Sequence, residues 1–194
     1  MRQKMVQNIN AIGNKYTSII LAWQKQAEFS PEVEWVGEMI QQDATRVLEL
    51  RRQIKALEAK MTALIPKSSI ANLIDSIPGY GSVSTAELAG EIGHHGRFAT
   101  EPSFALYLGM APLSHESGQY RGSETPRQVN RRAKAAMMVA VDRHRKQVAA
   151  SQKYYVKKRA EGKTHNQAIR ALGRQLCRVI YKILKEEKLY APPE

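Results

Sequence analysis

A short polar stretch in the middle of the chain, GMAPLSHESGQYRG at residues 109–122, holds the side chains best suited to chemistry. Ser114 and Ser117 flank His115 and Glu116. A serine hydroxyl is a weak nucleophile that needs a base or a metal, and an attacked phosphate needs cations. His115 and Glu116 are the nearby candidates for the base, and on an extended segment His115 would share a side with Ser117. A loop serine more often forms a turn or a helix cap, so both interpretations stay open here.

Cations follow this stretch closely, and a guanidinium can bind a phosphate through two parallel hydrogen bonds. The nearby arginines are Arg121, Arg127, Arg131 and Arg132. They belong to a strongly basic half: residues 119–188 hold 19 Lys and Arg against 5 Asp and Glu, a net charge of +14, whereas the remainder carries −2. This asymmetry indicates a polyanionic partner, nucleic acid before membrane. A merely solubilising surface is the alternative.

Composition narrows the class of protein further. The sequence has no apolar run of the ~18–20 residues that span a bilayer and no signal-peptide core at its start, so we expect no membrane partner and a cytoplasmic location. The single Cys177 fits a reducing compartment and, within RQLCRVIY, a buried helical position. The scattered histidines do not favour a metal site, and we expect no cofactor in this chain.

Residues 1–66 are predicted to form a coiled-coil arm. Between residues 31 and 65 apolar residues fill nine of ten heptad core positions, namely Val33, Val36, Ile40, Val47, Leu50, Ile54, Leu57, Met61 and Leu64, with Asp43 as the exception. An earlier helix with the same period, from Met5 to Trp23, is joined by a short connection, which predicts an antiparallel hairpin that dimerises. Two ordinary bundle helices are the alternative, but a helix of this length extends ~50 Å, too long for a small compact domain.

Residues 67–190 are predicted to form a compact helical domain. IPGYG at residues 77–81 separates two short helices, and residues 69–92 resemble a helix-hairpin-helix element. Gly79 and Gly81 would permit the tight turn, and the free N–H groups from Ser82 onward could hold a phosphate oxygen. A plain glycine turn is the alternative. Further helices are expected at 103–108, from about 127, and after a break at Gly162, where Thr164 would cap a last helix whose apolar face includes Ile169, Leu172, Leu176 and Ile180. Since no stretch alternates like a strand, the predicted class is all-α.

The order of these motifs resembles a known family. IPGYGSVSTAELAGEIG, LYLGMAP, ESG, the basic NRRAK helix and EGKTHNQAIRALGRQL follow one another as in the C-terminal transposase domain of the DEDD insertion-sequence recombinases. That family includes the pilin-inverting recombinases and the bridge-RNA-guided transposases. The resemblance covers about residues 70–188, and the arm resembles the family's coiled coil.

The resemblance implies a DNA transesterification in which the serine of a Ser-Gly pair attacks a phosphodiester. The matching residues are Ser117 and Gly118, with the Gly118 backbone, Arg121 and His115 as candidate helpers, while Ser114 lacks the following glycine. In the family, Mg²⁺ is bound by a RuvC-like acidic domain that precedes the coiled coil. We expect that domain to be absent from this chain.

The resemblance also implies DNA as a partner, a guide RNA as a second candidate, and a homo-oligomer formed through the coiled coil. The expected nucleic-acid contacts are Gly79, Gly81, Ser82, Arg127, Arg131, Arg132, Lys134, Lys163, Arg170 and Arg174. One segment departs from the family's Arg-x-Gly-Asn-x-x-Leu, because residues 127–133 read RQVNRRA. Two other classes stay open: a non-catalytic dimerising module or transposase fragment that binds DNA or RNA, and a coiled-coil interaction protein with a basic tail.

Overall fold

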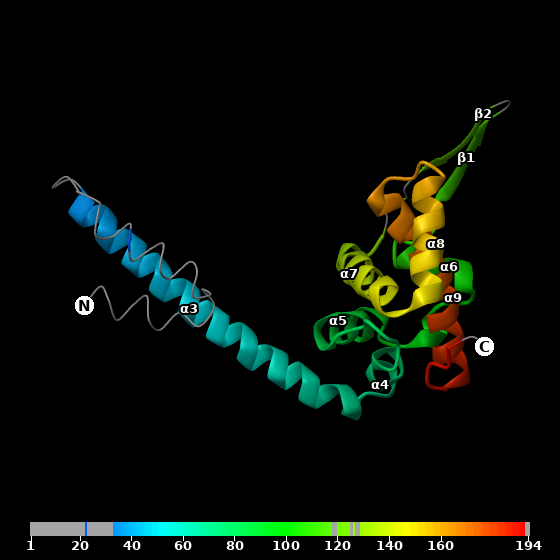
Figure 1. Ribbon diagram of the computed structural model, residues 1–194. Coiled ribbons are helices and arrows are strands. Elements are labelled where there is room, and N and C mark those ends of the chain that lie inside the picture. Colours follow the sequence, from blue (N-terminus) through cyan, green and yellow to red (C-terminus); the bar gives the residue numbers. More distant parts are fainter. Residues whose placement is uncertain (1–21, 23–32, 118–119, 125, 127–128, 193–194) are drawn as a thin grey trace. The chain divides into compact units, whose positions relative to one another are not determined.

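The computed structural model describes residue 22 and residues 33–117, 120–124, 126 and 129–192 (Figure 1). The chain divides into two compact units, residues 1–53 and 54–194. The described residues form a helical fold, which confirms the predicted all-α class. The helix expected between Met5 and Trp23 lies outside the described residues except at residue 22, and so does its hairpin connection.

The predicted long helix is present as α3, Val33–Leu64. It ends in a short 3-10 turn, η1, Ile65–Lys67, in which Pro66 cannot continue the helical hydrogen bonds. The core positions of the predicted coiled coil are 47 to 63 % exposed at Ile40, Val47, Leu50, Ile54, Leu57 and Leu64. Between Ile40 and Leu64, an apolar stripe interrupted at Asp43 is therefore exposed on α3.

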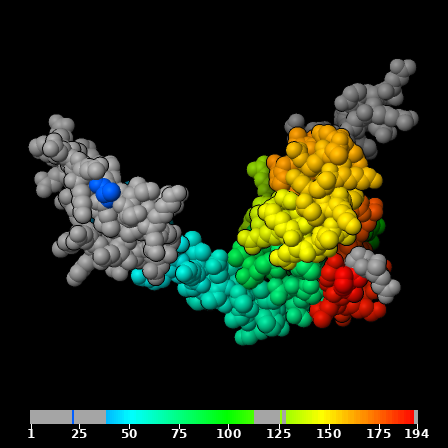
Figure 2. All heavy atoms as spheres, viewed as in Figure 1, coloured from blue at the N-terminus to red at the C-terminus, as the bar shows by residue number. Residues whose placement is uncertain are grey.

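Six helices build the compact part of residues 54–194. They are α4 Ser69–Asp75, α5 Ser82–Ile92, α6 Glu101–Tyr107, α7 Arg131–Gln147, α8 Ala149–Ala160 and α9 His165–Glu186. A 3-10 turn, η2 His95–Arg97, lies between α5 and α6. In Figure 2, α7 and α8 (yellow to orange) form much of one face above the green α4–α5 segment.

The central helix is α9, which packs against α4, α6, α7 and α8. Its apolar face buries Ile169, Leu172, Leu176 and Ile180, as its sequence pattern predicts. Cys177 is also fully buried there, and burial raises the pKa of its thiol, so this thiol is a core group rather than a reactive one. Thr164 caps the helix in a reciprocal pair of hydrogen bonds with Gln167, which confirms the predicted start.

The structure differs from the loop expected at residues 109–122, because residues 113–117 and 120–124 are strands. Two antiparallel strands, β1 Leu113–Ser117 and β2 Tyr120–Glu124, form a two-stranded ribbon there. Polar residues occupy both faces of this ribbon, so the apolar alternation that normally indicates a strand is missing. The next helix, α7, starts at Arg131 instead of about residue 127, because Asn130 caps it by accepting hydrogen bonds from the N–H groups of Arg132 and Ala133.

Candidate nucleic-acid and catalytic site

Ser117 is the last residue of β1 and pairs with Tyr120 at the end of the hairpin. The same register sets His115 opposite Gly122 and Glu116 opposite Arg121. Because successive residues of a strand alternate between faces, His115 falls on the face of Ser117, whereas Arg121 falls on the other. Gly118 lies outside the described residues.

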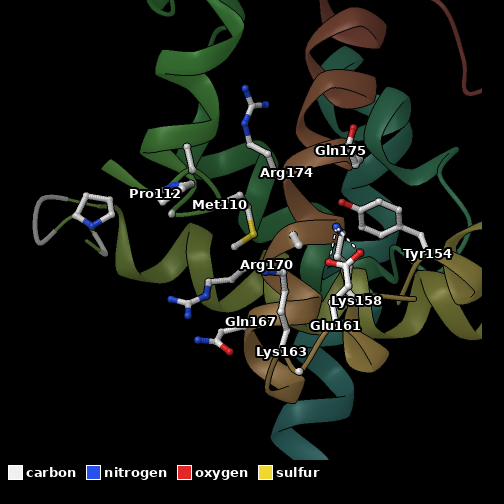
Figure 3. A pocket seen from close by; sticks show the side chains of 15 residues that line it. Met110, Pro112, Tyr154, Lys158, Glu161, Lys163, Gln167, Arg170, Arg174 and Gln175 are labelled. Carbon is white, nitrogen blue, oxygen red and sulfur yellow. Dashed lines mark hydrogen bonds and ion pairs between the residues drawn. The ribbon is translucent and has the colours of Figure 1, made fainter. Parts of the chain in front are cut away.

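The hairpin starts directly after Pro112 and ends shortly before Pro126, and both prolines line an open groove of about 640 Å³. We call this the basic groove; its walls come from the segment 109–112, α8, the turn after α8 and the first half of α9 (Figure 3). Ser117 is four residues along the strand from Leu113. At a rise of 3.3 Å per residue the serine lies ~13 Å from the groove end of the hairpin.

The cations of the basic groove are Lys158, Lys163, Arg170 and Arg174. The Lys158 ammonium donates to Glu161 at 2.8 Å, and this hydrogen bond raises the pKa of Lys158 and lowers that of Glu161. Arg174 forms a two-pronged ion pair with Glu101, the first residue of α6. The basic groove therefore brings together three of the predicted nucleic-acid contacts, Lys163, Arg170 and Arg174. The charge of Arg174 is matched by the Glu101 carboxylate.

Packing against α7 explains why the turn between α4 and α5 has a glycine at residue 79. Gly79 has a positive φ of +87°, and a side chain there would meet the backbone of His144, and of Arg143 at 2.8 Å, on α7. His144 holds the same turn by donating from Nδ1 to the Pro78 carbonyl at 2.7 Å. Burial lowers the pKa of His144 more than this bond raises it, so the neutral ring is favoured. Gly79 was predicted to contact nucleic acid, and the contact that the structure shows for it is with α7.

The second glycine of the turn, Gly81, is the N-cap of α5 and has no side chain to satisfy the first N–H groups of that helix. Ser82 is the first helical residue. A side chain at Gly81 would lie 3.2 Å from Nη1 of Arg143, so this guanidinium stands beside the helix start. Arg143 was not among the residues predicted from the sequence to contact nucleic acid. Its position beside His144 in a basic helix was the available indication of such a role.

The N-terminus of α7 lies at the other end of α5. Asn130 donates from Nδ2 to Glu91 of α5 at 2.5 Å and to the Tyr107 hydroxyl of α6 at 2.7 Å. Arg132 forms ion pairs with Glu87 at 2.8 Å and Glu91 at 3.1 Å, and its side chain stays 74 % exposed. The motif asparagine therefore joins three helices.

The predicted nucleic-acid residues consequently fall in three places. Gly81 and Ser82 lie at the start of α5, whereas Arg132 pairs with Glu87 and Glu91 in its second half, next to Arg131 at the start of α7. The third place is the start of the basic groove, where the aliphatic part of the Lys134 side chain packs over Gly109. Arg127 lies outside the described residues.

The described residues gather no three His, Cys, Asp or Glu side chains that could hold a metal ion. No described helix is both long and apolar enough to cross a membrane.

Several known proteins are similar in sequence. Residues 71–156 match the family described as "Transposase IS116/IS110/IS902 family". The chain is 34 % identical over 148 residues to the "Insertion element IS110 uncharacterized 43.6 kDa protein" of Streptomyces coelicolor, across 76 % of this chain and 36 % of that protein. It is 27 % identical over 194 residues to the "Insertion element IS900 uncharacterized 42 kDa protein" of Mycobacterium paratuberculosis, across 99 % and 48 %. The pilin gene-inverting protein of Moraxella bovis is 29 % identical over 121 residues, across 61 % and 38 %.

The match of residues 71–156 to the IS116/IS110/IS902 transposase family, together with these relatives, confirms the resemblance inferred from the motifs. The chain spans less than half the length of these relatives.

Proposed function

We propose that this chain is the DNA-binding and serine-bearing part of an insertion-sequence transposase or site-specific DNA recombinase. One observation carries the proposal: Ser117 of the Ser-Gly pair falls within the matched segment, on a hairpin that starts at the edge of the basic groove. The surrounding positive charge would bring a DNA phosphate close and stabilise the charge that develops during attack.

The proposed reaction is a transesterification. The Ser117 oxygen attacks a DNA phosphorus, the new O–P bond forms, and the bond to the leaving nucleotide oxygen breaks. The serine proton passes to a base, for which His115 is the candidate in this chain, and the leaving oxygen takes up a proton. A hydroxyl of another strand then attacks the phosphoserine, which rejoins DNA and restores the serine, so no external energy source is needed. A metal-binding acidic domain, as in the resembling family, would assist the activation.

Duplex binding tests the DNA-binding half of the proposal. Changing Arg131 and Arg143 to Gln removes one cation from each end of the α5–α7 pair, and we expect weaker binding to all sequences about equally. The slope of log affinity against log salt should fall by about 0.9 for each phosphate that the protein no longer neutralises. The control is Lys182→Gln with Lys185→Gln on α9, which makes the same charge change elsewhere. Affinity that stays flat between low and moderate salt would contradict the electrostatic account.

We also propose that α3 dimerises, because six apolar heptad core positions between Ile40 and Leu64 are exposed. Leu50→Lys with Leu57→Lys should convert an oligomer to a monomer in light scattering. Ala56→Lys with Ala63→Lys adds the same charge outside the heptad core and should leave the oligomer intact. A monomer in the unmodified chain would reject this part of the proposal.

A further inference from the structure

We propose that Met110 is a positioning residue for Ser117, because its side chain holds the base of the β1–β2 hairpin against Gly173 of α9. This inference rests on the proposed function, and it adds how the attacking hydroxyl would be kept in place. Three features support it: the hydrogen bonds at the base of the hairpin, the fit of Met110 to Gly173, and the ion pair formed by the next residue of α9.

Both ends of the hairpin segment are held by hydrogen bonds to the second half of α6. Before β1, the N–H groups of Met110 and Ala111 donate to the Ala105 carbonyl at 2.9 and 3.2 Å. After β2, the N–H of Asn130 donates to the Tyr107 carbonyl at 3.1 Å. The strand β1 begins two residues after Ala111. A displacement of Met110 would therefore pass directly into the strand that bears the serine.

The Met110 side chain lies beside α9 at a position where only glycine leaves room (Figure 3). Met110 is 2 % exposed, and a Cβ placed on Gly173 would lie 2.5 Å from its sulfur and 3.3 Å from its Cγ. Apolar atoms in contact are normally about 3.5–4.0 Å apart, so a methyl group at Gly173 would displace the sulfur by about 1 Å. Because Met110 has almost no exposed surface, part of this displacement would pass to its backbone.

This contact explains a glycine that the helix itself disfavours. Gly173 lies in the interior of α9, where glycine lowers helix stability relative to alanine. Gly90 on α5 provides the contrast, because a Cβ there would meet nothing within 4 Å. Alanine in place of Gly173 would strengthen the helix while it displaces Met110, so its two effects on folding stability partly offset each other.

The residue after Gly173 connects α9 to the start of α6. Arg174 forms a two-pronged ion pair with Glu101, the first residue of α6. Consecutive residues of α9 therefore contact both the start of α6, through Glu101, and the chain that leaves α6, through Met110. This arrangement holds the base of the hairpin on the core of the helical domain.

A displaced hairpin base would lower the rate of attack more than the affinity for DNA. Ser117 lies ~13 Å along β1 from Leu113 at about 3.3 Å per residue, so a tilt at the base moves the serine. A misplacement of about 1 Å can slow a reaction about 100-fold. The DNA contacts that we propose at Arg131 and Arg143 lie on α7 and would keep their positions.

The test uses the chain joined in one polypeptide to a metal-binding nuclease domain of the family, with a DNA substrate and any guide RNA it requires. The variants are Gly173→Ala and the double variant Gly173→Ala with Met110→Ala. The matched control is Gly90→Ala, which adds the same methyl group to a helix in open space. We measure the rate of adduct formation on Ser117 at saturating DNA and the affinity for duplex DNA by fluorescence anisotropy. All measurements are made well below the lowest thermal midpoint.

We expect Gly173→Ala to form the adduct at least about tenfold more slowly, while its affinity for DNA changes less than about twofold. Met110→Ala removes the atoms that collide with the new methyl group, so the double variant should react at least about threefold faster than Gly173→Ala alone. Gly90→Ala should change neither quantity. An unmodified rate in Gly173→Ala, equal losses of rate and affinity, or a double variant no faster than the single one would overturn the proposal.

A second measurement follows the hairpin without any reaction. Nitroxide labels are attached to cysteines introduced by Ser114→Cys on β1 and Lys185→Cys on α9, while the buried Cys177 should stay unlabelled. Double electron–electron resonance should show a distance distribution that shifts or widens with alanine at residue 173 and stays the same in the control. An unchanged distribution in that variant would overturn the proposal. If the unmodified protein forms no adduct on its serine, the proposed function fails, and the label distances alone decide whether the hairpin base is held as proposed.

Discussion

The junction of α5, α6 and α7 differs from the β1–β2 hairpin in how its residues are held. At the junction, Asn130, Glu91 and Tyr107 bond to one another across three helices above a buried apolar core. In the hairpin, two five-residue strands pair with each other and carry polar residues on both faces. An isolated two-stranded ribbon is marginally stable in water. Under the proposed function, the helices would fix where DNA docks, whereas the hairpin would let Ser117 adjust to its phosphate.

The largest expected effect on stability comes from Gly79, in the turn between α4 and α5 that packs against α7. Gly79→Ala combines a positive φ with a collision against the α7 backbone, so we expect a loss of about 3 kcal/mol or more in the free energy of unfolding. Gly162→Ala has the positive φ in open space and should cost about 1 kcal/mol. Gly90→Ala has neither problem and should stabilise α5 by about 0.5–1 kcal/mol. Urea unfolding measures all three, and equal losses at Gly79 and Gly162 would refute the packing argument.

The Asn130 network should show a somewhat smaller effect. Asn130→Ala removes the helix cap and the amide that donates to Glu91 and Tyr107, for a loss of about 2–3 kcal/mol. Asn130→Ser keeps a capping oxygen and loses the amide donor, so it should fall between the alanine variant and the unmodified chain. Thermal and urea unfolding give the order. A serine variant no better than the alanine variant would assign the whole effect to the network and none to the cap.

The smallest of these effects is expected at the buried His144, as a loss of folding stability in mild acid. Its pKa is lowered in the folded state by burial, so below the ordinary value of 6.5 the unfolded chain binds a proton that the folded chain excludes. Stability from this group is complete above pH 6.5 and declines as the pH falls from there toward the folded pKa, by at most about 1.4 kcal/mol per pH unit. In His144→Gln this part of the pH dependence should vanish. The same slope in the variant would show that another group is responsible.

Local periodicity and caps predicted much of the helical fold. The long helix α3, the apolar face of α9 and the Thr164 cap follow from neighbours in the sequence, and the structure confirms each of them. The coiled coil of α3 stays a prediction. The β1–β2 hairpin was not predicted from the sequence, because polar residues lie on both of its faces. The strands therefore lack the alternation of apolar and polar residues that normally indicates a strand. The hairpin's one local indication was the two-residue Gly118-Gln119 connection, since glycine is typical of the first position in such turns.

The candidate site was predictable only in part. Ser117 could be selected because the ordered motifs resemble a family, whereas spacing alone left a turn or cap open. The basic groove could not be predicted, because it joins residues 109–112, 126 and 154–175 through tertiary packing. For the same reason no local pattern could show that Glu101 meets Arg174, or that Arg143 stands beside Gly81.

The most direct test of the central claim asks which atom of the protein becomes joined to DNA. The chain is expressed in one polypeptide with a metal-binding nuclease domain of the family and given a DNA substrate and any guide RNA it requires. Reactions are quenched, separated on a denaturing gel, and the protein–DNA adduct is mapped by peptide mass spectrometry.

We predict an adduct on the peptide that contains Ser117, absent in Ser117→Ala and retained in the matched control Ser114→Ala. Unfolding of both variants should stay within about 0.5 kcal/mol of the unmodified protein, because the hairpin carries the chemistry rather than the fold. An adduct on Ser114 or on a tyrosine, or undiminished cleavage by Ser117→Ala, would contradict the account.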